Sequence, residues 1–482
     1  MERTVKLPRS TPEAQGIPSE AIMRFLDDIA GRSIETHGFM IVRNGHAVAE
    51  GAWAPYRLED RRMLFSLSKS FTSTAIGFAA SEGLLALNDP VVGYFPEDLP
   101  EEPSPRLEEL RIRDLLTMST GQAKDTIPLS NEGGDENWAR AILSEPVAYP
   151  PGTRFVYNSG ATYLLSAILH RATGESLLEY LKPRLLEPLG IANATWDTCP
   201  RGIAAGGWGL SISVEDIAKF GLLYLQDGIW EWKRVLPEGW TEEATSKQVD
   251  NGNEADNDWN QGYGYQFWRC RHGAYRGDGA FGQFCIVLPD RNAVVAVASG
   301  TDNMAGIMQA VWDNLLPAMG PEAIEDHESS VRPLKERLSS LRYEPPASEA
   351  AEPAEPAAER RMNGIVYRLD DNPAGLESIS FSFGDEQAVV VSLVNSRGEQ
   401  RLAAGRGHWR ESRCRLLSDA NQTVAASAAW SDSGSLRLTM RFVETPFTFD
   451  VDIRPKADGT VEVGMRERAG RSEYSAVQGK PQ

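Results

Sequence analysis

The pattern of hydrophobic positions divides the chain into a mixed α and β part and a second part rich in strands. In the first part, residues 37–51 read as two strands joined by an Asn44-Gly45 turn, a strong indication of a β-hairpin. Residues 281–299 form a second pair of strand-like runs, with a turn at Asp290 to Asn292. These pairs come from opposite ends of the first part, and we expect them to share one sheet.

Helical patterns occupy the sequence between the two strand pairs. Residues 163–174 have apolar positions at helical spacing and end at Gly174, a residue type that commonly follows the last helical turn. Residues 214–225 show the same spacing, and another helix should follow the second strand pair. Its apolar face consists of Met304, Ile307, Met308, Val311, Trp312 and Leu315. The economical fold is an antiparallel sheet flanked by terminal helices, with a helical insertion.

A linker and a strand-rich tail complete the chain. Residues 321–361 are poor in aromatics and rich in Glu, Pro and Ala, which is typical of linkers. Strand-like runs then recur between turn residues at 376–383, 388–394, 435–442 and 447–453. The predicted parts are an α+β domain at 1–325, a linker at 326–360 and an all-β barrel or sandwich at 361–482.

Composition and charge limit the classes of function. The chain has 482 residues, which is longer than a single hydrophobic core usually supports, so we expect more than one domain. Hydrophobic residues make up 41% of the chain, as in ordinary globular proteins. With 49 Lys and Arg against 68 Asp and Glu, the formal net charge is -19, which disfavours nucleic acid and anionic membranes as partners. The N-terminus shows no secretory pattern, and the four cysteines show no metal-ligand or disulfide spacing. We expect a cytoplasmic protein without a metal or cofactor.

The sharpest chemical motif is Ser66-x-x-Lys69, at the start of a predicted helix. A spacing of three places both side chains on one helix face. The buried stripe of this helix would be Leu67, Phe71, Ala75 and Phe78. A lysine in an apolar site can be neutral enough to take the serine proton and create a nucleophile. The same residues would also fit an N-capping serine followed by a surface lysine.

A second candidate is Tyr157, which follows a Pro-Gly turn and precedes a predicted helix. Beside a lysine, its phenol can serve as general base for the serine and as proton donor to the leaving group. The alternative is a tyrosine that packs its ring and satisfies its hydroxyl locally.

The third candidate is the segment from Arg276 to Gly282, which matches Gly-x-Gly-x-x-Gly. A dinucleotide-binding turn must open a helix, whereas buried strands follow here, so we reject that interpretation. We expect an exposed strand edge whose glycines let a substrate backbone approach closely. The sequence lacks Gly-x-Ser-x-Gly, His-Glu-x-x-His and phosphate-loop motifs, and its six histidines show no ligand spacing. His272 is the histidine nearest to the third segment.

In this order, the three segments resemble the serine β-lactamase and penicillin-binding-protein superfamily, above all class C β-lactamase-like esterases and D-aminopeptidases. Stretches 110–122, 150–160 and 206–228 support the likeness, which covers about residues 10–320. The resemblance implies an acylated nucleophile at Ser66, its activating partner at Lys69 and an acid/base at Tyr157. It implies an oxyanion hole from the backbone N–H groups of Ser66 and Ala280. The tail is similar to the lipocalin-like barrels of some D-aminopeptidase-type relatives.

One departure from the family pattern lies after the tyrosine. The chain has Tyr157-Asn158-Ser159 where the family has Tyr-x-Asn. Ser159 therefore replaces the amide that usually contacts the substrate, unless Asn158 turns into the site instead.

A second departure lies in the third segment, where Gly277-Asp278-Gly279 replaces Lys-Thr-Gly or His-x-Gly. It lacks the cation that usually meets a substrate carboxylate, so Arg276 or His272 would have to substitute. Together with the net charge of -19, this disfavours anionic β-lactams. We expect Ser159, Asp278 and Gly279 to contact the substrate.

Three functions remain open. The leading one is a serine hydrolase that forms an acyl-enzyme with a small ester or amide, with carboxylesterase activity ahead of β-lactamase activity. The second is a D-aminopeptidase-like or other amide hydrolase in which Asp278 attracts a substrate ammonium group. The third is a non-catalytic binding or sensor module with a penicillin-recognising fold. The tail either covers part of the hydrolase surface or shapes the substrate site.

Overall fold

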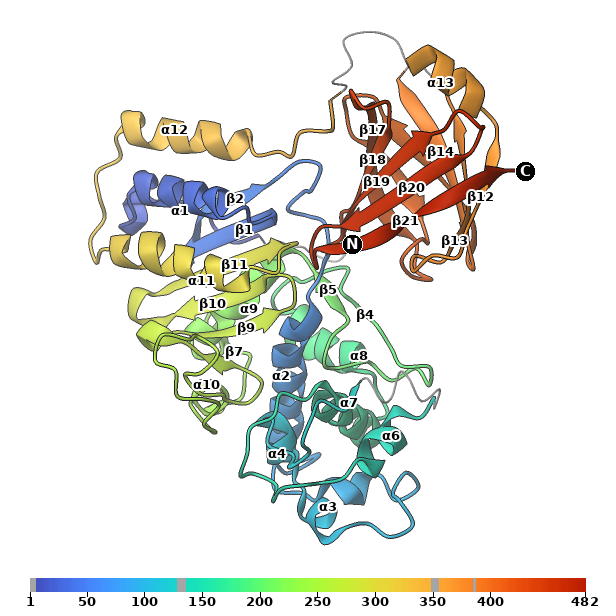
Figure 1. The fold of residues 1–482 in the computed structure, drawn as a ribbon. Coiled ribbons are helices and arrows are strands. Elements are labelled where there is room, and N and C mark those ends of the chain that lie inside the picture. The colour runs from blue at the N-terminus through green and yellow to red at the C-terminus, as the bar shows by residue number, and fades with distance from the viewer. Residues whose placement is uncertain (1–5, 128–135, 348–354, 385–386) are drawn as a thin grey trace.

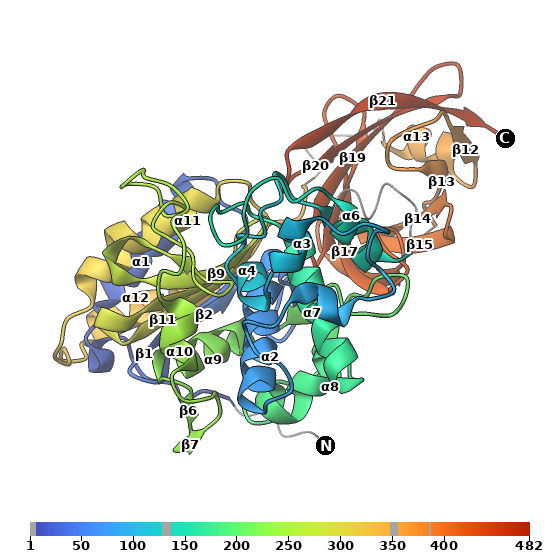
Figure 2. The same ribbon diagram turned by 90° about the horizontal axis from the view of Figure 1, so that it is seen from below.

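The chain folds into a mixed α and β domain and a β-barrel that lie side by side (Figure 1). The structure is a computed structural model that describes residues 6–127, 136–347, 355–384 and 387–482. The helical insertion projects from one end of the first domain, and the barrel lies against its other end, as the view from below also shows (Figure 2).

The first domain is built on a six-stranded antiparallel sheet with strand order β2-β1-β11-β10-β9-β8. Its strands are β1 (Thr36–Arg43), β2 (His46–Ala52), β8 (Trp268–Arg269), β9 (Tyr275–Gly279), β10 (Gln283–Leu288) and β11 (Ala293–Ser299). The Asn44-Gly45 turn has φ values of 50° and 79°, as a two-residue hairpin turn requires. Because β1 pairs with β11, strands from both ends of the domain meet in one sheet, and this prediction is confirmed.

Alternate residues of the sheet fill two separate cores. On β1, Phe39 and Ile41 join the cluster under α1 and α11, whereas Met40 and Val42 join the cluster that contains α2 and α9. The bounds of these helices are α1 (Ser19–Gly31), α2 (Ser68–Ser81), α9 (Val214–Leu225) and α11 (Met304–Ala310). The sheet is therefore the middle of three layers, and α2 lies on the face that also meets the helical insertion.

The helical insertion surrounds α2 with short helices and small sheets. Its helices are α3 (Pro105–Glu109), α4 (Ile112–Leu116), α6 (Trp138–Ser144), α7 (Ser159–Thr173), α8 (Leu177–Leu181) and α10 (Trp240–Thr245). Its strands are β3 (Arg62–Met63), β4 (Thr195–Trp196), β5 (Leu210–Ile212), β6 (Ile229–Trp230) and β7 (Lys233–Arg234). The predicted helix end at Gly174 is confirmed, since Gly174 adopts φ 75° and donates to the His170 carbonyl. Within the described ranges, no helix is long and apolar enough to cross a bilayer.

The segment predicted as a linker contains two helices, α12 (Glu328–Ser339) and α13 (Glu355–Met362). Helix α12 packs on α1, and Leu334 and Leu341 are buried in the same core as α1. This part of the segment extends the first domain, because its few apolar residues face one side of α12. The exact domain boundaries stay a prediction.

The tail forms a barrel, which decides between the two all-β folds that the sequence allowed. Its strands are β12 (Val366–Leu369), β13 (Leu376–Ser382), β14 (Ala388–Asn395), β15 (Gly398–Gly405), β16 (Arg410–Cys414), β17 (Gln422–Trp430), β18 (Leu436–Phe442), β19 (Thr448–Pro455), β20 (Val461–Glu467) and β21 (Ser472–Pro481). They form one ten-stranded sheet, and β15 also pairs with β17. Alternating burial along β14 fills the interior with apolar side chains, and α13 adds Ala358 and Met362 to this core.

Candidate active site

Ser66 lies in a single 3-10 turn, Phe65–Leu67, that joins β3 to α2. The preceding residue, Phe65, has φ 49°, a left-handed conformation that is strained for a bulky side chain. Ser66 remains partly exposed and does not cap α2, whose N-cap residue Leu67 makes no side-chain hydrogen bond. The alternative of an N-capping serine is therefore wrong.

Lys69 is buried at the start of α2, with only 1% of its surface exposed. Its Nζ donates to Ser66 Oγ (3.1 Å), to Ser159 Oγ (3.2 Å) and to the Gly207 carbonyl (2.7 Å). Burial lowers the pKa of this amine from 10.5 to about 7, although Asp125 and Asp278 partly oppose the shift. The alternative of a surface lysine is wrong, and an amine within reach of Ser66 is half neutral near pH 7.

Tyr157 lies beside Ser66 and Lys69 just before α7. Its ring stacks on Trp268 with centroids 5.5 Å apart, and Lys69 Nζ lies 4.9 Å from its ring centroid. Burial and the charge of Asp278 raise the pKa of the phenol well above 10, against the effect of its hydrogen bond with Ser66. Tyr157 is consequently a protonated phenol at neutral pH, suited to donate a proton rather than to accept one.

The two residues after Tyr157 have separate tasks. Asn158 is fully buried and caps α7, since its Oδ1 accepts from the N–H of Ala161 (3.3 Å) and from Thr126 Oγ1 (3.0 Å). Ser159 instead directs its hydroxyl to Lys69. The structure thus answers the question that the sequence left open: Ser159, and not Asn158, faces the catalytic candidates.

Three contacts of the site come from residues that the sequence did not single out. Asp125 accepts from the N–H of Ser159 at 2.9 Å and acts on the charge of Lys69. Gly207 supplies the carbonyl that holds Lys69, and Trp268 supports the ring of Tyr157. Gly207 lies in one of the stretches that support the family likeness, and Asp125 follows another. Neither residue type indicates a role without its position.

The third candidate segment lies on β9, between β10 and the short strand β8. The β9 residues are all buried, so the predicted exposure is wrong. Strand β8 pairs only with Tyr275 and Arg276, so among the described residues Gly277 to Gly279 have no paired strand on that side. A Cβ added at Gly277 would overlap with Leu67, and one added at Gly279 would overlap with the Leu64 carbonyl. The glycines therefore admit the turn that carries Ser66.

Ala280 follows β9 and is exposed. The close approach of Gly279 to Leu64 places the end of β9 against the Ser66 turn, and β9 packs on that turn along its length. Ser66 and Ala280 thus belong to segments that pack on each other, and both residues are accessible to solvent. An oxyanion hole requires two backbone N–H groups that can donate to the same oxygen, and two segments that face each other can supply them.

The charged residues of β9 form a buried ion pair. Arg276 is 0% exposed, and its Nη2 lies 2.8 Å from Asp278 Oδ2. The guanidinium also donates to the Asp258 carbonyl (2.9 Å) and lies over the Trp259 ring (4.5 Å). His272, the other candidate cation, is exposed and packs edge-to-face on Trp312, a residue of the core under α11. Neither candidate is therefore placed to replace the missing cation of the family motif.

We expect Asp278→Asn to lower the free energy of unfolding of the first domain by about 3 kcal/mol. The substitution leaves the Arg276 guanidinium buried without its countercharge, and burial of an unpaired charge is costly. Urea unfolding followed by tryptophan fluorescence measures the change.

The matched control is Asp227→Asn, which removes one partner of an exposed ion pair in the same domain. Asp227 Oδ2 lies 3.4 Å from Arg234 Nη2, and 61% of the Asp227 side chain is exposed. Solvent screens such pairs, so a change below about 1 kcal/mol is expected. Equal effects of the two substitutions would show that burial does not strengthen the Arg276–Asp278 pair.

Comparison with known proteins supports a hydrolase. A family model described as Beta-lactamase matches residues 23–318. The chain is 27% identical over 251 residues to the 6-aminohexanoate-dimer hydrolase of Paenarthrobacter ureafaciens, a match that covers 48% of this chain and 63% of that protein. It spans between 52% and 63% of the length of the first curated relatives that it matches.

Solved structures show the same fold. The octameric penicillin-binding protein homologue from Pyrococcus abyssi matches with a TM-score of 0.51 at 17% identity, over 95% of this chain and 99% of that one. EstCE1, described as a hydrolase with promiscuous acyltransferase activity, matches with a TM-score of 0.50 at 17% identity, over 61% of this chain and 99% of that one. The first match extends through the barrel, so the two-part architecture occurs in another protein.

Proposed function

Because this chain belongs to the beta-lactamase family, we propose that it is a serine hydrolase in which Ser66 forms an acyl-enzyme with a small ester or amide. The observation that carries the proposal is the contact of Lys69 Nζ with Ser66 Oγ at 3.1 Å, in a site that lowers the pKa of this lysine to about 7. A neutral amine at hydrogen-bond distance can take the serine proton as attack begins.

In the first half of the reaction, Ser66 Oγ attacks the substrate carbonyl carbon and its proton passes to Lys69 Nζ. The carbonyl oxygen becomes an oxyanion that the N–H groups of Ser66 and Ala280 stabilise. Collapse of the tetrahedral intermediate breaks the bond to the alcohol or amine. The protonated phenol of Tyr157 donates the proton that the leaving group needs, and Lys69 returns a proton to the phenolate.

In the second half, a water molecule attacks the acyl carbonyl, and its proton passes to the neutral Lys69. The same two N–H groups stabilise the second oxyanion. Release of the carboxylic acid restores the Ser66 hydroxyl with the proton that Lys69 accepted. Ser159 and the Gly207 carbonyl hold Lys69 in place through both halves.

The Arg276–Asp278 pair favours a substrate without a charged group at this wall of the site. The guanidinium is buried and already paired, so it offers no free cation to a β-lactam carboxylate. The Asp278 carboxylate is already paired in the same contact, which weakens the D-aminopeptidase-like alternative, in which it attracts an ammonium group. Carboxylesterase activity therefore stands ahead of β-lactamase and aminopeptidase activity in this proposal.

The test is intact-mass measurement of the protein after brief exposure to p-nitrophenyl butyrate, followed by peptide mapping. We expect one butyryl group, located on Ser66, that accumulates during the initial burst of nitrophenol release and disappears once the ester is consumed. A protein that releases no nitrophenol and carries no adduct would contradict the proposal and support the non-catalytic binding module.

A further inference from the structure

The barrel reaches the candidate active site through the hairpin tip, residues 443–447, which joins β18 to β19. Two residues of β3 hold this tip from the other domain. The N–H of Met63 donates to the Glu444 carbonyl at 2.9 Å, and the buried guanidinium of Arg62 donates to the Val443 carbonyl. Since β3 leads directly into the Ser66 turn, the tip touches the segment that positions the nucleophile.

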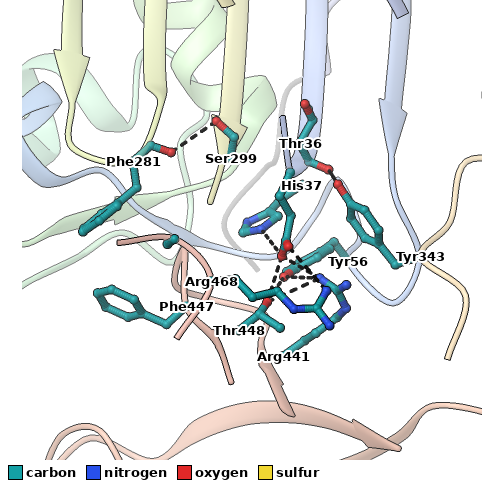
Figure 3. A network of polar contacts seen from close by, with 12 residues as sticks. Thr36, His37, Tyr56, Phe281, Ser299, Tyr343, Arg441, Phe447, Thr448 and Arg468 are labelled. Atoms are coloured by element: carbon teal, nitrogen blue, oxygen red, sulfur yellow. Dashed lines mark hydrogen bonds and ion pairs between the residues drawn. The ribbon is translucent and has the colours of Figure 1, made fainter. Parts of the chain in front are cut away.

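A cluster of three phenylalanines joins the tip to both sides of the proposed oxyanion hole. Phe65 precedes Ser66, Phe281 follows Ala280, and Phe447 belongs to the tip. Their ring centroids lie 5.3 Å apart for Phe65 and Phe281, 5.4 Å for Phe281 and Phe447, and 6.3 Å for Phe65 and Phe447. All three pairs meet edge to face, a favourable geometry for aromatic rings. Figure 3 shows Phe447 of the barrel next to Phe281, which lies in the turn between β9 and β10.

Both phenylalanines of the first domain have strained backbones. Phe65 has φ 49° and Phe281 has φ 63°, in the left-handed region that bulky residues avoid. Such conformations persist where the surrounding structure imposes them. The backbone here is held at one side, because the Thr301 N–H donates to the Phe281 carbonyl at 3.2 Å and Ser299 Oγ donates to the Gly282 carbonyl at 2.6 Å. Ser299 Oγ also lies 3.2 Å from the Phe281 carbonyl (Figure 3). At the other side, the Phe447 ring packs on the rings of both strained residues.

A buried polar network anchors the two strands that carry the tip (Figure 3). Glu35, just before β1, accepts from Arg441 Nη1 (2.6 Å) and from Thr448 Oγ1 (2.8 Å). Arg441 and Thr448 are paired neighbours on β18 and β19 at the base of the tip. Although burial alone would raise it, the pKa of Glu35 is lowered to about 2 by His37 and Arg441, so this anchor stays ionised at neutral pH. The base of the tip is therefore fixed to the segment just before β1.

We propose that Phe447 is a positioning residue of the hydrolase: its ring holds Phe65 and Phe281 so that the N–H groups of Ser66 and Ala280 converge on the oxyanion. The inference rests on the proposed function. It assigns to the barrel a part in transition-state stabilisation that is independent of the acyl chain. A ring that only lined the substrate pocket would instead act differently on short and long acyl groups.

The experiment compares full-length wild type with Phe447→Ala on p-nitrophenyl acetate, butyrate and hexanoate. We expect the acylation rate constant to fall by about 10- to 100-fold, by the same factor for all three esters, with little change in the dissociation constant of the ester measured before the steady state. Phe447→Leu, which keeps an apolar side chain in the cluster, should recover part of the rate. The melting temperature of each variant is measured alongside the assay. If Phe447→Ala melts below the assay temperature, Phe447→Leu is compared with wild type instead, and we expect a smaller fall in the acylation rate constant that is again equal for all three esters.

The matched control is Phe449→Ala, two residues farther along β19. Phe449 packs edge to face on Phe442 with centroids 5.8 Å apart and is partly buried against the barrel core. We expect this variant to acylate at the wild-type rate.

Three outcomes would overturn the inference: an unchanged rate for Phe447→Ala, a loss that depends on acyl length, or an equal loss for Phe449→Ala. Absence of the Ser66 adduct in wild type would instead overturn the proposed function.

Discussion

Replacement of Ser66 by alanine should lower kcat/KM for p-nitrophenyl butyrate by about 10⁴-fold or more, because loss of the nucleophile removes the covalent route. The butyryl adduct should be absent from the intact-mass spectrum. Folding should be unaffected, since Ser66 is partly exposed and does not cap α2. Nitrophenol release and intact mass, measured on the same samples, check both expectations.

The control for this variant is Ser73→Ala on the same helix. Ser73 is buried, and its hydroxyl has no hydrogen-bond partner among the described residues, so its removal leaves no group unsatisfied. Wild-type turnover and an intact adduct are expected. If Ser66→Ala kept more than a few percent of the wild-type rate, acylation would have to occur elsewhere.

Replacement of Lys69 by methionine should lower kcat/KM by about 10³-fold, the contribution typical of a positioned general base. In wild type, kcat/KM should rise with pH through about 7, because Lys69 accepts a proton only in its neutral form. The variant should lack this pH dependence. Steady-state rates from pH 5.5 to 9 on the neutral butyrate ester measure both effects.

Lys69→Arg separates the base from the charge. A guanidinium stays protonated throughout this pH range, so it preserves the positive charge but cannot accept the serine proton. We expect it to be as inactive as Lys69→Met. Retention of activity in Lys69→Arg would assign the base role to another group.

The same lysine has a predictable effect on stability. Between its unfolded pKa of 10.5 and its folded value of about 7, the unfolded chain holds a proton that the folded protein lacks. Stability therefore falls as pH decreases through this window, and the loss is complete below about pH 7. Relative to Lys69→Met, wild type should gain about 3 kcal/mol between pH 7 and 10 in urea unfolding. A constant difference in the free energy of unfolding between the two proteins across this range would show that folding does not lower the pKa of Lys69.

Much of the fold follows from local sequence patterns. The hairpin at Asn44-Gly45, the helix that ends at Gly174 and the helix at 214–225 were all predictable, because turn chemistry and hydrophobic period act over a few residues. The strand runs of the tail were predictable for the same reason. The helix α12 in the linker was not predicted, since it buries too few apolar residues to produce a strong helical pattern.

In the candidate site, too, some features follow from the sequence and others only from the folded structure. The spacing of Ser66 and Lys69 and the order of the three segments are properties of the sequence, and they carried the family resemblance. The burial of Lys69, the turning of Asn158 into the α7 cap and the pairing of Asp278 with Arg276 are not. Asn and Ser are both polar, so only the backbone path before α7 determines which of them faces the site.

What the sequence by itself determined is therefore most of the elements, the family and the candidate reacting side chains. The tertiary structure decided their environment. Lys69 is bound by the Gly207 carbonyl, 138 residues away, and Glu35 meets Arg441 across 406 residues. Contacts of this length depend on how whole domains pack, and no local period encodes them. The pKa of Lys69 and the position of the Phe447 ring both arise from such contacts, because burial and distance between groups exist only once the chain has folded.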